Sequence, residues 1–131
     1  MPPGHRLAAR KKLRLADLVG EPLIVAGTGF TIRRMLDGQA GSSRKHLDIA
    51  VESNSFEAIT SLVKSGAGVA IRTMVGIRDE VGRGEVVFVP ISEPGFHMEN
   101  VAIITRSGRP LAVPAAIFTE HLAAGLAALR G

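Results

Sequence analysis

The chain has 131 residues, of which 46% are hydrophobic and 21% are charged. This balance fits one domain with an apolar core and excludes an intrinsically disordered segment. There is no cysteine, so disulfides, thiolate metal sites and cysteine nucleophiles are excluded. The apolar runs are shorter than the roughly 18 to 20 residues of a membrane span, so we expect no membrane partner.

The net charge of +4 is concentrated in residues 1–14, which hold basic side chains and no acid. These are Arg6, Arg10, Lys11, Lys12 and Arg14. No apolar segment of the kind found in a secretory signal follows them, so we expect a cytoplasmic protein. A basic arm that binds nucleic acid is one interpretation, but no aromatic side chain is interleaved for base stacking. We therefore interpret residues 1–14 as a solvated lead-in to the first helix.

The first half of the chain alternates apolar runs with polar turns. Residues 22–26 predict a strand, which ends at Gly27-Thr28-Gly29, and a helix is predicted over residues 30–36. The polar, Gly/Ser-rich residues 38–46 predict a loop, and residues 47–52 predict the next strand.

A second helix is predicted to start within Ser53-Asn54-Ser55 and to end at Gly66. Asn54 is expected to be its N-cap, with Glu57 three residues later as in a capping box. The helical spacing predicts one apolar face for the sheet, made of Phe56, Ile59, Leu62 and Val63.

Two strands and a helix complete the predicted lobe: a strand over residues 69–71, a short helix over 74–81 and a strand over 85–89. A last strand is predicted over residues 101–105 and a last helix over 115–129. The apolar face of that helix is expected to comprise Ile117, Phe118, Leu122, Leu126 and Leu129. We expect this face to be covered by the lobe itself, by a second copy or by crystal neighbours, because it would otherwise be a large exposed patch.

Strands separated by helices of this length indicate an α/β fold with a mostly parallel sheet flanked by helices. Three segments, in their order along the chain, resemble a known family. HRLAARKKLRLADLVGEPLIV, VESNSFEAITSLVKSGAGVAI and VAIITRSGRPLAVPAAIFTEHL resemble segments of the effector-binding domain of LysR-type transcriptional regulators. The first of these segments has Arg6 where the family pattern usually has Pro.

The resemblance implies a lobe similar to those of periplasmic binding proteins, truncated at its N-terminus and without the family's DNA-binding helix-turn-helix. Residues 1–14 would then be a basic lead-in near the first interlobe crossover, and residues 15–90 would be lobe two. Residues 91–131 would hold the return crossover, the last strand and the C-terminal helix of lobe one. We expect either a fragment or a start assigned to an internal Met.

The effector site is expected beyond the ends of the parallel strands, where open sheets bind their ligands. The expected effector-binding residues are Gly27, Thr28, Gly29, Phe30, Thr31, Ser53, Asn54, Ser55, Arg72 and Thr73. The glycine turn followed by a helix start favours an anion, and Arg72 suits a carboxylate. A purely structural reading is open for each segment: a turn, a helix cap or an exposed arginine. Arg33 and Arg34 are interpreted as solvent exposed.

The resemblance implies a small-molecule sensor that acts by population shift, with a small anionic effector, a homodimer, and DNA contact only through the missing N-terminal domain. No cofactor is expected. No metal site is expected either, because the four histidines have no ligand spacing. One alternative is a solute-binding protein of a transporter, against which the missing signal argues. The other is a small α/β enzyme, which needs a catalytic constellation that the sequence does not reveal.

Overall fold

The computed structural model describes residues 1–38, 47–94, 96 and 102–128. By its internal contacts the chain divides into two units, Met1–His97 and Met98–Gly131, which are described separately. The predicted loop over residues 38–46 lies almost entirely outside the described residues.

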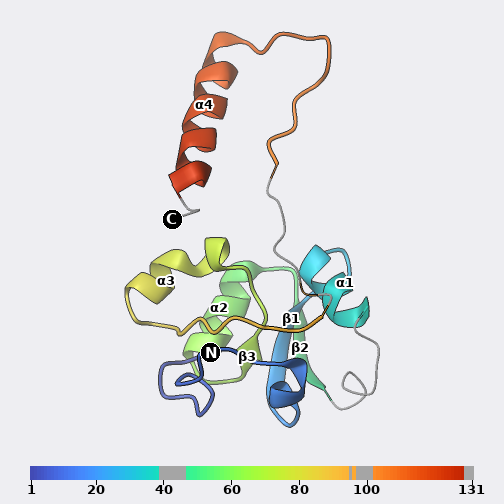
Figure 1. Ribbon diagram of the computed structural model, residues 1–131, viewed down its shortest axis with the longest axis vertical. Coiled ribbons are helices and arrows are strands. Elements are labelled where there is room, and N and C mark those ends of the chain that lie inside the picture. The colour runs from blue at the N-terminus through green and yellow to red at the C-terminus, as the bar shows by residue number, and fades with distance from the viewer. Residues whose placement is uncertain (39–46, 95, 97–101, 129–131) are drawn as a thin grey trace. The chain divides into compact units, whose positions relative to one another are not determined.

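The first unit is built on a parallel sheet of β1 (Pro22–Ala26), β2 (Asp48–Ser53) and β3 (Val69–Ala70), in the order β2-β1-β3 (Figure 1). β1 is therefore the central strand. The predicted α/β class and its mostly parallel sheet are confirmed.

Alternate side chains of β1 enter two separate apolar clusters, one on each face of the sheet. Leu23 and Val25 belong to the first cluster. Ile24 and Ala26 belong to the second. Burial on both sides explains why this strand is apolar throughout instead of alternating with polar residues.

Different elements cover the two faces. α1 (Thr31–Gly38) packs Leu36 into the first cluster, and α2 (Phe56–Lys64) packs Ile59 and Val63 into the second. The successive crossovers β1-α1-β2 and β2-α2-β3 therefore leave the sheet on opposite faces.

The N-terminal stretch packs more closely than a solvated lead-in. Leu7 and Leu13 are buried in the first cluster beside η1 (Leu15–Leu18). His5 and Arg6 bind the buried carboxylate of Glu21. The expectation of a solvated stretch is wrong here, because its leucines supply one cover of the sheet. The remaining basic side chains are exposed: Arg10, Lys11, Lys12 and Arg14.

The N-cap of α2 is Ser55, not Asn54 as predicted. The Ser55 side chain accepts a hydrogen bond from the Ala58 backbone N–H at 3.2 Å. Phe56 is the first residue of the helix and is 42% exposed, so its assignment to the core face is wrong. Gly66 ends the helix region as predicted, with a φ of 82° that suits glycine.

The predicted strand over residues 85–89 does not form. Val87 exchanges backbone hydrogen bonds with Met1 at 2.9 and 3.3 Å, and Val86 is buried in the second cluster. The segment is apolar because it is covered, not because it belongs to the sheet. The predicted helix over residues 74–81 is split into η3 (Met74–Ile77) and α3 (Arg78–Gly82).

The second unit contains α4 (Val113–Ala128), which begins two residues before the predicted start. Residues 102–105 form no strand, and Val101 and Leu129 lie outside the described residues. None of the described residues of α4 is buried, so a cover over its apolar face stays a prediction. Within the described parts of the chain, no helix has both the length and the apolar character needed to cross a bilayer.

The substitution Gly68→Ala tests how closely β3 approaches β1. A Cβ at this position would lie 2.3 Å from the Pro22 carbonyl oxygen and 3.2 Å from Ile24 Cγ1. Because the first neighbour is backbone, the strands must shift, and we expect Gly68→Ala to lower the free energy of unfolding by about 1–3 kcal/mol. Urea titration followed by circular dichroism measures this loss. Gly82→Ala is the control, because nothing lies within 4 Å of its Cβ, and an equal loss in both variants would contradict the prediction.

Candidate functional site

The three parallel strands end side by side. β1 pairs with β2 through Ala26↔Ser53 and with β3 through Ile24↔Ala70, so the segments that follow all leave the same edge of the sheet. These three segments hold the expected site residues, namely Gly27–Thr31 after β1, Ser53–Ser55 at the end of β2 and Arg72–Thr73 after β3. The pairing thereby brings the expected site residues to one edge of the sheet. Connections that depart to opposite faces from adjacent strands mark the position at which open α/β sheets bind ligands.

The first two segments touch at Gly27. A Cβ there would lie 2.2 Å from Asn54 Oδ1, so the Asn54 side chain occupies the space that any larger residue would need. Gly29 has no atom within 4 Å of an added Cβ and lies open. The buried Gly27 thus has a packing reason of its own, whereas Thr28, Gly29 and Thr31 face solvent.

Local capping uses two of the expected polar groups. Ser53 Oγ accepts a hydrogen bond from the Ser55 N–H at 3.1 Å, and Ser55 Oγ caps α2. For these two serines the structural role is present. Four other polar side chains of the predicted site have no hydrogen-bond partner among the described residues, namely those of Thr28, Thr31, Asn54 and Thr73.

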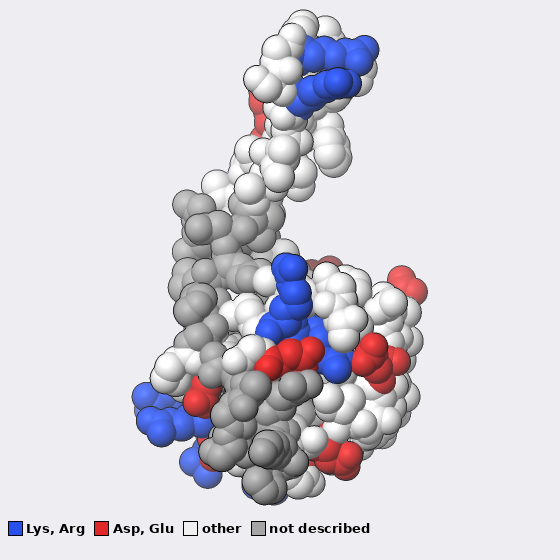
Figure 2. All heavy atoms as spheres, turned by 90° about the vertical axis from the view of Figure 1, so that its right-hand side faces the viewer, with Lys and Arg blue, Asp and Glu red and all other residues white. Residues whose placement is uncertain are grey.

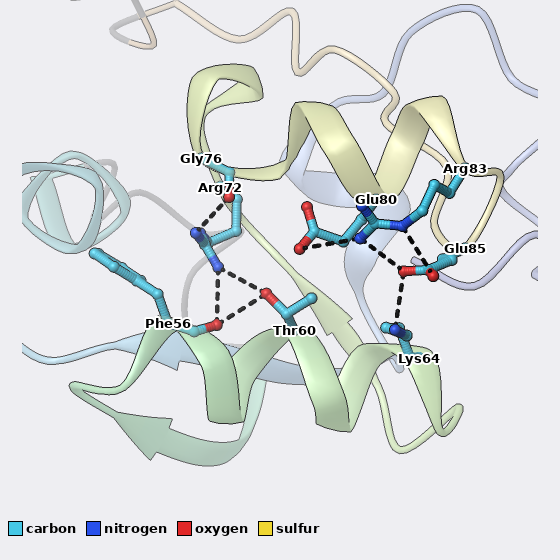
Figure 3. A network of polar contacts seen from close by, with 8 residues as sticks. All are labelled: Phe56, Thr60, Lys64, Arg72, Gly76, Glu80, Arg83 and Glu85. Atoms are coloured by element: carbon cyan, nitrogen blue, oxygen red, sulfur yellow. Dashed lines mark hydrogen bonds and ion pairs between the residues drawn. The ribbon is translucent and has the colours of Figure 1, made fainter.

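Arg72 joins two elements that flank the strand ends (Figure 3). Its Nη1 donates to the Phe56 carbonyl and to Thr60 Oγ1 on α2, both at 3.3 Å. Its Nη2 donates to the Gly76 carbonyl of η3 at 3.2 Å. The guanidinium is therefore held in place, and it is not the freely exposed arginine of the structural reading.

The guanidinium of Arg72 also lies over the ring of Phe56, with Cζ 4.3 Å from the ring centroid. Phe30 meets the same ring edge-on, at a centroid distance of 5.0 Å and an interplanar angle of 66°. Phe30, Phe56 and Arg72 come from the three segments, and together they form a cluster that we call the aromatic–cation cluster. Helical spacing predicted that Phe56 belongs to the core face, so its place in this cluster was not predicted from the sequence. The available signal was its position at the very start of the helix, where a side chain reaches the sheet edge.

The charge of Arg72 is not neutralised locally. Its three acceptors are uncharged, and no carboxylate in the described part of the chain forms an ion pair with it. Burial lowers the pKa of Arg72 from its usual value, and the more distant Glu80 opposes that shift. The side chain nevertheless stays a cation, because an arginine starts from a very high pKa.

Arg33 behaves differently from the expectation that it is solvent exposed. It is buried, donates to Glu52 at 2.5 Å and to Asp37 at 3.1 Å, and also reaches the Ala26 carbonyl. The hydrogen bonds that it donates to Glu52 and then to Asp37 raise the pKa of Arg33. Arg34 is exposed as predicted. On the α1 side of the first unit, Figure 2 accordingly shows basic and acidic side chains next to each other instead of a surface of one sign.

A second polar network lies at the other end of α2. Glu85 binds Lys64 at 2.9 Å and Arg83 at 3.1 Å, which connects α2 to the end of α3 (Figure 3). The side-chain hydrogen bonds of Arg83, and then that of Lys64, lower the pKa of Glu85 to about 2. These residues are paired with one another and contribute to the scaffold. No group of His, Asp and Glu side chains within the described ranges could hold a metal ion.

The model of the LysR substrate binding domain family matches residues 1–127. The chain is 28% identical over 119 residues to the HTH-type transcriptional activator CmpR of Synechocystis sp., which covers 90% of this chain and 38% of that protein. It is 29% identical over 127 residues to the transcriptional activator protein LysR of Escherichia coli, with 96% and 40% covered. The chain thus spans about two fifths of the length of these curated relatives.

A solved structure shows the same fold. The regulatory domain of NMB2055 (MetR), a LysR family regulator from N. meningitidis, superposes with a TM-score of 0.52 at 22% identity. The match covers 70% of this chain and 43% of that one. It supports the assignment of the α/β lobe independently of the sequence comparisons.

Gly27→Ala tests the contact between the first two segments. The added Cβ would overlap Asn54 Oδ1, so we expect the Asn54 side chain to move away. The side-chain NH₂ signals of Asn54 in a ¹⁵N-correlation spectrum report this movement. Gly29→Ala is the matched control, because its Cβ meets nothing within 4 Å. Unchanged Asn54 signals in Gly27→Ala would show that the contact does not exist in solution.

The Glu85 network predicts a pH-dependent stability. A carboxyl group with a folded-state pKa of about 2, below the ordinary 4.5, stabilises the fold above pH 4.5 and loses this contribution as the pH falls toward 2. We expect Glu85→Gln to lower the urea midpoint at pH 7 and to approach the parent chain near pH 3. Glu57→Gln, at an exposed position without an ion pair in the described residues, is the control. A midpoint difference that stays constant between pH 7 and pH 3 would refute the coupling.

Proposed function

The chain belongs to the LysR substrate-binding domain family, and from that premise we propose that it binds a small carboxylate effector at the carboxyl edge of its parallel sheet. The observation that carries the proposal is the state of Arg72. Its guanidinium is held by neutral acceptors, lies at the strand ends and forms no ion pair with a carboxylate of the described residues.

The donor count of Arg72 supports a carboxylate. Arginine has five N–H donors. The described structure gives acceptors to both Nη1 protons and to one Nη2 proton, which leaves Nε–H and one Nη2 proton. No fully buried side-chain nitrogen among the described residues lacks a hydrogen-bond partner, so the unpartnered Nε of Arg72 is in contact with solvent. Two donors on one guanidinium match the two oxygens of a carboxylate.

The neighbouring segments offer further polar groups of the right kind. The Asn54 amide and the hydroxyls of Thr28, Thr31 and Thr73 have no hydrogen-bond partner in the described structure. The backbone N–H groups at the start of α1 add the positive end of a helix dipole. Such groups orient a ligand, and no bond has to be made or broken for this binding.

We propose the family's mode of action for the protein to which this lobe contributes. An effector that prefers one arrangement of the two lobes shifts the population toward it, and DNA-binding segments outside this chain respond. Pairing of two effector domains into a homodimer and a cytoplasmic location belong to the same proposal. The matched relatives named above are transcriptional activators, which supports a regulator and not an enzyme.

The lobe boundaries are part of the proposal too. Residues 15–90 are assigned to lobe two, with residues 1–14 as its lead-in and residues 91–131 as the return to lobe one. The break between Met1–His97 and Met98–Gly131 supports a boundary near this position. The burial of Leu7 and Leu13 supports a lead-in that is packed against lobe two.

Acetate is the simplest probe of the proposed site. We expect a titration at constant ionic strength to shift the Arg72 Nε–H signal and the backbone amides of Gly29 and Asn54 together. One lobe supplies only part of a pocket, so the expected Kd for acetate is of millimolar order. This corresponds to a binding free energy of about −4 kcal/mol. NMR at neutral pH measures it directly from the saturation of the shifts.

Matched variants separate the site from general charge attraction. Arg72→Gln is expected to weaken acetate binding at least about tenfold, because it removes the charged fork. Arg34→Gln makes the same change at an exposed position and is expected to have no effect. Equal losses in the two variants, or no shift at Arg72 Nε–H, would contradict the proposed function. An unchanged affinity in Thr31→Ala would remove the first segment from the site.

A further inference from the structure

Large apolar side chains are exposed on the two elements that Arg72 joins. Phe56 at the start of α2 is 42% exposed, and Met74 and Val75 of η3 are 40% and 52% exposed. Single exposed apolar residues are common on protein surfaces. Here they belong to the two elements whose carbonyl groups hold the Arg72 guanidinium, and apolar side chains beside one charged group are the composition of a small-molecule site.

The aromatic–cation cluster has a defined geometry. Phe30 meets Phe56 edge-on at 5.0 Å, while Arg72 lies over the Phe56 ring at 4.3 Å. The guanidinium is fixed by the Phe56 and Gly76 carbonyls, which come from the two elements with exposed apolar side chains. Because the guanidinium lies against the Phe56 ring, a ligand whose carboxylate binds Arg72 would bring its body close to this ring.

Resting on the proposed function, we propose that the effector is an aromatic carboxylate whose carboxylate binds Arg72 and whose ring packs on the Phe30–Phe56 pair. A planar ring can extend the edge-to-face arrangement that the two phenylalanines already form. A carboxylate without an apolar body leaves Phe56 exposed and gains only the charged contact. A saturated ring buries a similar area, but it lacks the attraction between the positive edge of one aromatic ring and the negative face of another.

Three probes separate these contributions: acetate, cyclohexanecarboxylate and benzoate. They share the carboxylate, and the last two also share approximate size. Their Kd values for the chain are measured by NMR from the shift of the Arg72 Nε–H signal at constant ionic strength. We expect benzoate to bind about 5- to 50-fold more tightly than acetate and several-fold more tightly than cyclohexanecarboxylate.

Phe56→Leu keeps an apolar side chain and removes the ring. We expect it to abolish the preference for benzoate over cyclohexanecarboxylate while acetate binding changes by less than about threefold. Phe88→Leu makes the same substitution in the segment beside Val87, which pairs with Met1, and is expected to keep the preference. If Phe56→Leu is not folded by circular dichroism, Phe30→Leu provides the same test from the other ring of the pair.

The outcomes distinguish the two proposals. If acetate and benzoate bind to Arg72 with equal affinity, the site binds carboxylates without a preference for an aromatic ring. The inference then fails, and the proposed function stands. Equal binding of benzoate and cyclohexanecarboxylate, or a benzoate preference that survives loss of the ring, also overturns it. If none of the three probes shifts Arg72, the proposed function and the inference fail together.

Discussion

The fold depends on one strand being buried on both faces. β1 contributes Leu23 and Val25 to one apolar cluster and Ile24 and Ala26 to the other. Four consecutive buried apolar side chains supply a hydrophobic stabilisation of several kcal/mol, at about 1.5–3 kcal/mol for each large one. This strand therefore has to be central, and a neighbour has to pair with each of its edges, which gives the order β2-β1-β3.

The central position of β1 also determines where the proposed effector site lies. Parallel pairing aligns the strand ends, so Gly27, Asn54 and Arg72 reach one edge although 45 residues separate the first from the last. The helices that follow β1 and β2 cover opposite faces of the sheet. The position of the proposed site is thus a consequence of the topology, and we expect its specificity to depend on the side chains that come first after each strand.

Periodicity and turn residues in the sequence were sufficient for the three paired strands and the two helices that cover them. They failed where the outcome depends on a partner far along the chain. Residues 85–89 are apolar enough for a strand, but their backbone pairs with Met1, and no local pattern reveals that contact. Burial of Arg33 depends on Glu52, which stands 19 residues away in the sequence and becomes a neighbour only through sheet pairing. Phe56 has the helical spacing of the buried Ile59 and Val63, but as the first helical residue after the Ser55 N-cap it lies at the end of the helix and stays exposed.

Two arginines show how the surroundings decide between a structural and a binding role. Arg33 donates to two carboxylates and a carbonyl, so its charge is neutralised and no ligand is needed. Arg72 is fixed by three neutral oxygens and a ring, which order the side chain without neutralising it. Ordering a long side chain on binding costs about 0.5–1.5 kcal/mol, and a guanidinium that is already held avoids most of that loss. Partial burial adds to the effect, because an anion meets less competing water there than at an exposed lysine or arginine. For this reason we propose Arg72, and not Arg33, as the group that recognises a carboxylate reversibly.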